Sequence, residues 1–98
     1  MFQERVIDLS NYKPEDLIIS GIQGGVLSAT TEGSPIVMFK ARNSEIDADF
    51  NLAVINMGTL AKVDYINGQG AFLIPCSGIE KVTLSVSGSG KIKIKELS

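Results

Sequence analysis

Apolar and polar residues alternate along most of this chain, and turn-forming residues interrupt the alternation about every eight to twelve residues. Successive side chains of a strand point to opposite faces, so a period of two is typical of strands with one buried face. The pattern is clearest in segment 80–86, where Val82, Leu84 and Val86 share one face. A helix would scatter these three residues around its axis. The alternation therefore predicts an all-β protein.

The interruptions divide the chain into about eight short strands. Asn67 and Gly68 favour a type I′ hairpin, because both central residues of that turn need positive φ, and we expect the turn to pair the strands on either side. Lys91, Lys93 and Lys95 line one face of the last strand, and a row of lysines is typical of a sheet edge. The expected strands are residues 3–9, 16–20, 26–31, 36–41, 50–56, 62–66, 71–76, 80–86 and 91–97.

Two interpretations of the local structure fit the segment before Phe50. Residues 42–48 are predicted to form a polar loop. Ser44 could instead cap a short helical turn within residues 44–52, with Asp47 three residues later. The period of two that resumes at Phe50 favours the loop followed by a strand.

Strands in this number cannot bury their apolar faces in one open sheet, so a second layer is required. We expect residues 1–98 to form a single domain, an antiparallel β-sandwich of jelly-roll type. Phe39, Phe50 and Phe72 occupy apolar positions of the alternation and are predicted to lie in the core. Cys76 is the one cysteine, and we expect a small buried hydrophobe there rather than a reactive thiol.

Charge and residue types argue against several function classes. Nine Lys and Arg against eleven Asp and Glu give a net charge of −2, without the basic stripe that nucleic-acid binding needs. The longest apolar runs, 17–19 and 36–39, are far shorter than the roughly 18 residues of a membrane-spanning helix, and segment 1–6 lacks the features of a secretory signal. No histidine is present, so the commonest general base and zinc ligand are missing. We expect a protein that is not an enzyme and that has no cofactor, nucleic-acid partner or membrane partner.

Two candidate binding sites have simpler interpretations. Glu45, Asp47 and Asp49 alternate within one loop and could begin a calcium site, but EF-hand spacing is absent and a solvated acidic loop is the expected reading. Tyr12 and Tyr65 are the only polar aromatic residues, and no tryptophan is present, so an aromatic platform for sugar binding is not evident.

Four segments, taken in chain order, follow a pattern seen in other β-sandwich proteins. They are 7–12 (IDLSNY), the medial strand 50–55, 70–84 (GAFLIPCSGIEKVTL) and 88–94 (GSGKIKI). This order resembles the β-sandwich modules of tailed-bacteriophage virion proteins. Those modules open with Asp, an apolar residue, Ser-Gly and an aromatic residue, and they close with a hairpin, a Gly-rich bend and an alternating C-terminal strand.

The resemblance implies a non-enzymatic role in the virion, as a capsid decoration or a head or tail accessory, in a protein made in the host cytoplasm. It also implies partners among capsid or tail structural proteins, with a homo-oligomer as an open possibility. Two loops are the expected contact regions, with candidate contacts at Arg42, Asn43, Glu45, Asp47, Asn67 and Gln69. A carbohydrate-binding β-sandwich module is the alternative function.

Overall fold

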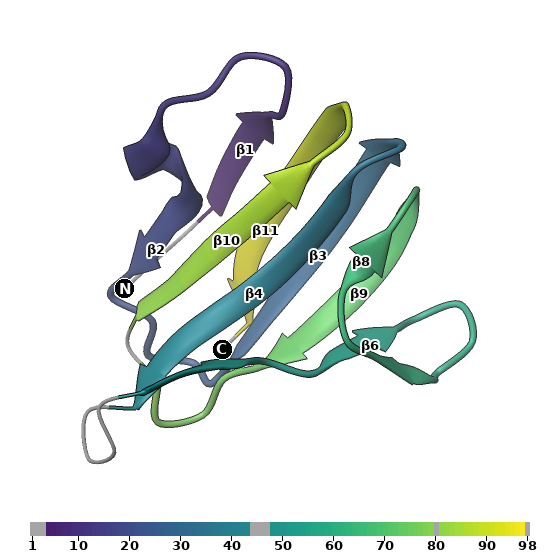
Figure 1. Ribbon diagram of the computed structural model, residues 1–98. Coiled ribbons are helices and arrows are strands. Elements are labelled where there is room, and N and C mark those ends of the chain that lie inside the picture. The colour runs from purple at the N-terminus through teal and green to yellow at the C-terminus, as the bar shows by residue number, and fades with distance from the viewer. Residues whose placement is uncertain (1–3, 44–47, 80, 98) are drawn as a thin grey trace.

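The computed structural model describes residues 4–43, 48–79 and 81–97 and shows two antiparallel sheets packed face to face (Figure 1). The six-stranded sheet has the order β1-β11-β3-β9-β6-β7, and the five-stranded sheet has the order β2-β10-β4-β5 with β8 also paired to β4. The strands are β1 (Glu4–Asp8), β2 (Ile18–Ser20), β3 (Val26–Gly33), β4 (Ile36–Asn43), β5 (Ala48–Asn51), β6 (Val54–Asn56), β7 (Lys62–Val63), β8 (Ile66–Asn67), β9 (Gly70–Pro75), β10 (Lys81–Ser87) and β11 (Gly90–Leu97).

Eight of these strands have jelly-roll connectivity. The order β1-β11-β3-β9 in one sheet faces β2-β10-β4-β5 in the other, so the chain passes between the sheets at nearly every connection. This is the two-Greek-key arrangement of a jelly roll, and it confirms the predicted β-sandwich. Strands β6, β7 and β8 are an insertion between β5 and β9. β6 and β7 widen the six-stranded sheet at the edge opposite β1, whereas β8 pairs with β4 of the other sheet.

One hydrophobic cluster fills the space between the sheets. Phe39 and Phe72 belong to it, as predicted. Phe50 does not, because its side chain is 41% exposed; β5 pairs only with the end of β4, so no further strand covers the ring. The buried members are Ile7, Leu9, Ile19, Ile22, Leu27, Ala29, Val37, Phe39, Ala41, Leu52, Val54, Ile66, Phe72, Ile74, Cys76, Val82, Leu84, Ile92 and Ile94.

The lysine row of β11 was misread as the mark of an edge strand. β11 pairs with β1 on one side and with β3 on the other, so it is an interior strand. Lys91, Lys93 and Lys95 are exposed because they face solvent, while Ile92 and Ile94 between them are fully buried. Acidic residues on the flanking strands, among them Glu4 and Glu32, make this row compatible with an interior position.

The predicted hairpin at Asn67 and Gly68 is also wrong. β8 pairs with β4, whereas β9 pairs with β3 and β6, so this turn crosses between the sheets instead of joining two paired strands. Gly68 has φ +91°, but Asn67 does not have positive φ, which a type I′ turn requires. The crossing is held by Thr31, whose buried hydroxyl donates to the carbonyl of Gly68 at 2.8 Å.

Several strand boundaries differ from the expected ones, and the expected strand 62–66 is divided into β7 and β8, which lie in different sheets. Residues 14–17 form a single 3₁₀ turn, η1 (Pro14–Leu17), so β2 is shorter than predicted. β4 continues to Asn43, and the expected strand 50–56 is divided into β5 and β6, which lie in different sheets. Residues 44–47 lie outside the described part of the chain, but 48–51 are a strand, so the helical alternative over 44–52 does not hold for them. No helix in the described ranges has the length and hydropathy to cross a membrane.

A buried carboxylate joins the C-terminal strand to the loop between β2 and β3. Glu96 is only 8% exposed, and its Oε2 accepts hydrogen bonds from the backbone N–H groups of Gln23 at 3.2 Å and Gly24 at 2.6 Å. Its other oxygen, Oε1, is buried without a hydrogen-bond partner. The loop therefore depends on one charge-assisted acceptor supplied by a residue more than seventy positions away.

We expect Glu96→Ala to lower the free energy of unfolding by about 2–3 kcal/mol, because two backbone donors lose their acceptor. Glu96→Gln should cost less, since the amide oxygen can replace Oε2, although its NH₂ group would take the unpartnered place of Oε1. Urea unfolding followed by circular dichroism measures both. An alanine variant as stable as the parent would show that the carboxylate does not hold the loop.

Candidate interaction surface

The predicted contact residues fall at opposite ends of β4. Arg42 and Asn43 belong to its last two positions, and Glu45 and Asp47 lie outside the described residues. Asn67 pairs with Ile36, at the first position of the same strand. Ile36 is six positions from Arg42 and seven from Asn43 along β4, which corresponds to roughly 20–23 Å. The structure therefore does not bring them together into one surface.

The acidic group predicted as a minor calcium option cannot be assembled from the described residues. Asp49 is exposed on β5, whereas its two companions fall in the range 44–47. In the ranges that the structure describes, no group of three or more His, Cys, Asp or Glu side chains could hold a metal ion.

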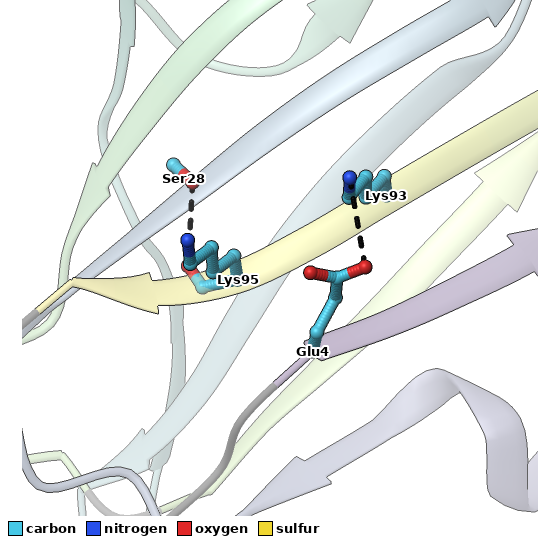
Figure 2. Close-up of polar contacts among 4 residues, drawn as sticks. All are labelled: Glu4, Ser28, Lys93 and Lys95. Atoms are coloured by element: carbon cyan, nitrogen blue, oxygen red, sulfur yellow. Dashed lines mark hydrogen bonds and ion pairs between the residues drawn. The ribbon is translucent and has the colours of Figure 1, made fainter.

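The outer face of the six-stranded sheet is charged over β1, β11 and β3. Lys93 Nζ lies 3.5 Å from Glu4 Oε1, in an ion pair whose side chains are about half exposed (Figure 2). Beside it, Ser28 Oγ donates a long hydrogen bond of 3.4 Å to the carbonyl of Lys95 (Figure 2). Because these groups are solvated, the ion pair contributes little to stability and mainly sets the charge pattern of the surface.

An open groove of about 260 Å³ lies on this charged half. It is lined by Val6, Thr30, Glu32, Lys91 and Lys93, so cationic and anionic groups face the same space. Its walls combine one apolar side chain with ammonium, carboxylate and hydroxyl groups.

The same sheet face becomes apolar over β9 and β6. Leu73 lies opposite Ile55 in register, and Met57 donates its backbone N–H to the carbonyl of Ala71 at 2.9 Å, which places these four residues together. Phe72 and Ile74, the neighbours of Leu73, are buried, so Leu73 faces outward. Val26 and Leu97, paired in register on β3 and β11, continue the apolar area. We call this area the apolar patch: Val26, Ile55, Met57, Ala71, Leu73 and Leu97.

Leu60 lies in the turn between β6 and β7, three residues after Met57 of the apolar patch, and this turn extends away from the sandwich in Figure 1. It is 75% exposed, more than any other large hydrophobic residue described. Its φ of +60° makes it the one non-glycine residue with positive φ in the described ranges. A leucine in this conformation costs of order 1 kcal/mol, so the turn holds an exposed apolar side chain at the expense of stability.

The strained turn is fixed by its own hydrogen bonds. Leu60 N–H donates to the carbonyl of Asn56 at 2.6 Å, and Asn56 N–H donates to the carbonyl of Ala61 at 2.9 Å. Asn56 Oδ1 accepts from the N–H groups of Gly58 at 2.8 Å and Thr59 at 3.3 Å. Leu60 is therefore presented from a preorganised backbone. The alternation of apolar and polar residues does not indicate this role, although the asparagine that opens the turn is the residue type expected for such a side-chain acceptor.

Leu60→Asn and Leu60→Gly should each raise the free energy of unfolding by about 0.5–1 kcal/mol, because both residues adopt positive φ at lower cost than leucine. Thermal and urea unfolding of the two variants measure the change. Lower stability in both would mean that the Leu60 side chain makes packing contacts that offset the backbone strain.

Cys76, as predicted, is a buried hydrophobe. It is 2% exposed, and its backbone N–H donates to the carbonyl of Gly25 at 2.7 Å. Burial raises the pKa of the Cys76 thiol, and the carboxylate of Glu96 raises it further, against a smaller opposite effect of a backbone hydrogen bond from Leu27. The raised pKa keeps the sulfur protonated and poorly nucleophilic.

At pH 8 we expect the Cys76 thiol of the folded protein to react with a thiol reagent about a hundredfold more slowly than in urea, because burial and the raised pKa both suppress the reactive thiolate. The raised folded-state pKa also stabilises the fold below the ordinary thiol pKa, and this stabilisation is lost as pH rises through the folded value. Rapid stoichiometric labelling of the native protein would contradict this description of the site.

Comparison with known proteins shows the fold but no family. No protein-family model matches the chain, and no curated protein matches it. The SPBc2 prophage-derived protein YomS is similar in structure, with 14% sequence identity and a TM-score of 0.66 over 96% of this chain and 92% of that one. The PBSX exported protein XepA is similar with 12% identity and a TM-score of 0.65 over 93% of this chain. This chain spans 37% of the XepA chain.

These two structural neighbours come from phage-derived proteins, and at such identities they show that the fold is shared. In one of them the fold makes up almost the whole chain, and in the other it is part of a longer chain. A carbohydrate binding module of family 29 also matches, with a TM-score of 0.39, a value too low to indicate a common fold.

Proposed function

We propose that this chain is a non-enzymatic, virion-associated structural protein that binds a larger viral protein assembly, as a capsid decoration or a head or tail accessory. The observation that carries the proposal is the jelly-roll sandwich it shares with two phage-derived proteins over more than nine-tenths of its length. Jelly rolls recur in viral capsid domains, where they supply rigid surfaces for assembly. The surface itself supports a binding role, since the exposed Met57 and Leu97 and the half-buried Ile55 and Leu73 lie on one face of the six-stranded sheet.

The side chains in the described ranges also support a role without catalysis. Cys76 is buried with a raised pKa, and the chain has no histidine to activate a hydroxyl nucleophile. The groove on the charged half is lined by exposed ion-forming side chains rather than by a buried acid–base pair. Partners among capsid or tail proteins follow from this proposal.

Mass spectrometry of purified virus particles from the source of this sequence tests the proposal. The chain should be present, and its copy number should be set by the symmetry of the structure it joins. On the order of hundreds of copies would assign it to the capsid surface, and from a few to a few dozen copies would assign it to a tail or vertex. Absence from intact particles would contradict a virion role.

Carbohydrate binding is the alternative, and one observation bears on it. Tyr12 and Tyr65 are 39% and 42% exposed, as a stacking platform would require. They lie at opposite edges of the sandwich, however, between β1 and β2 and between β7 and β8, so they do not form a common platform. A glycan array in which binding is lost in Tyr12→Ala or Tyr65→Ala would favour this alternative, and an array without hits would remove it.

A further inference from the structure

The apolar patch lies between two lysines. Across five neighbouring strands, Lys95, Ser28, Leu73, Ile55 and Lys62 occupy one row in register. The two ammonium groups thus stand on either side of the Leu73 and Ile55 pair, about four strand spacings or roughly 19 Å apart at their backbones. Neither Lys62 nor Lys95 forms an ion pair with the side chains that the structure describes. The patch is an apolar centre with one lysine on each side; Lys95 has Glu4 as its register partner on β1, and Lys62 lies at the other edge of the sheet.

We propose that the apolar patch, with Leu60 as its projecting anchor, is the surface that docks onto a different protein of the viral assembly. That protein presents an apolar depression flanked by carboxylates. The inference rests on the proposed function and assigns the binding surface within it. An apolar centre surrounded by polar groups is the usual anatomy of a protein interface, and a rigid side chain that enters a partner's pocket is the usual form of its strongest contact.

The conformation of Leu60 supports the anchor role. Its backbone is strained, its turn is fixed by hydrogen bonds, and its side chain is exposed, so the chain gives up stability to hold an apolar group in solvent. Fixing the side chain before binding reduces the entropy lost on association. Asparagine or glycine would adopt this positive φ at lower cost. A contact made by the leucine side chain with a partner would explain why leucine occupies the position.

The lysine on each side of the apolar patch disfavours a second copy of this chain as the occupant. A two-fold axis through the centre of the row would bring Lys62 of one copy against Lys95 of the other, and like charges across an interface oppose association. A membrane surface is disfavoured too, since recognition of anionic lipid takes clusters of about four to eight basic residues rather than two.

Site-specific photo-crosslinking in assembled particles tests the surface. A photoreactive phenylalanine analogue is placed at Ala71, which is exposed on the apolar patch, or at Ser85, which is exposed on the outer face of the five-stranded sheet. We expect crosslinks to a different structural protein from position 71 and none from position 85. Crosslinks from 85 alone, in particles that contain the chain, would overturn the surface assignment and leave the proposed function standing. Crosslinks from 71 to another copy of this chain would overturn the assigned partner, and a chain absent from particles would overturn both proposals.

Binding of purified variants to particles that lack the chain tests the chemistry. Lys62→Glu and Lys95→Glu should each weaken binding about tenfold and reduce its dependence on salt, while Lys40→Glu, an exposed charge on the other sheet, should change it less than about twofold. Leu60→Asn should weaken binding about tenfold or more although it stabilises the fold, and Val6→Asn, an exposed apolar residue on the charged half, should not. Equal effects of patch and control variants would overturn the proposal, as would binding of the parent chain to anionic vesicles that Leu60→Asn abolishes.

Discussion

The architecture depends on the last strand entering the six-stranded sheet between β1 and β3. β1 has no other strand partner among the described residues, so the N-terminal strand joins the sheet only when the C-terminal strand is in place. Backbone hydrogen bonds reinforce this pairing at the end of the sandwich, where Leu9 N–H donates to the carbonyl of Gly90 and Ser34 N–H donates to the carbonyl of Ser89. Gly90 allows the start of β11 to lie close to β3. A Cβ on Gly90 would lie 2.0 Å from the carbonyl oxygen of Glu32, and the φ of Gly90 is +136°.

The position of β11 between β1 and β3 also determines which side chains the outer face of the six-stranded sheet exposes to solvent. β11 brings three lysines into the interior of the sheet, beside the acidic residues of β1 and β3, so that half of the outer face is hydrophilic and largely self-neutralised. β6 and β7 extend the sheet at its other edge, and β6 and the turn after it add Ile55, Met57 and Leu60 there. One sheet face thus has a charged half that suits solvent and an apolar half that suits a partner. The difference follows from which strands are neighbours, not from local composition alone.

The sequence was sufficient to predict the class of fold, and in physical terms this was the easier part. Alternation decides which residues of a strand face inward, and it correctly placed Val82 and Leu84, Ile92 and Ile94 in one core. Strand neighbours are not contained in that pattern, because they depend on pairings between distant segments. The lysine row of β11 was read as an edge and the Asn67 turn as a hairpin for this reason: each motif is informative about its own strand, but neither specifies the partner.

Less of the candidate surface could be predicted. The contacts expected at Asn67 and at Arg42 lie at the two ends of β4, and they remain predictions. The apolar patch draws residues from four strands and one turn, and its members look like ordinary alternating positions until the register is known. Glu96 resembles the solvated charges beside it in sequence, yet it is buried by the loop that it binds.

Residue-resolved amide hydrogen exchange of the isolated protein tests the central claim that β11 is an interior strand closing the six-stranded sheet. The account predicts that amides of Ile92 and Ile94 exchange only through global unfolding, as slowly as those of Val82 and Leu84 in β10. Fast exchange along β11, with slow exchange in β3 and β9, would contradict it. The closed sheet, and the surface that depends on it, would then not exist as described.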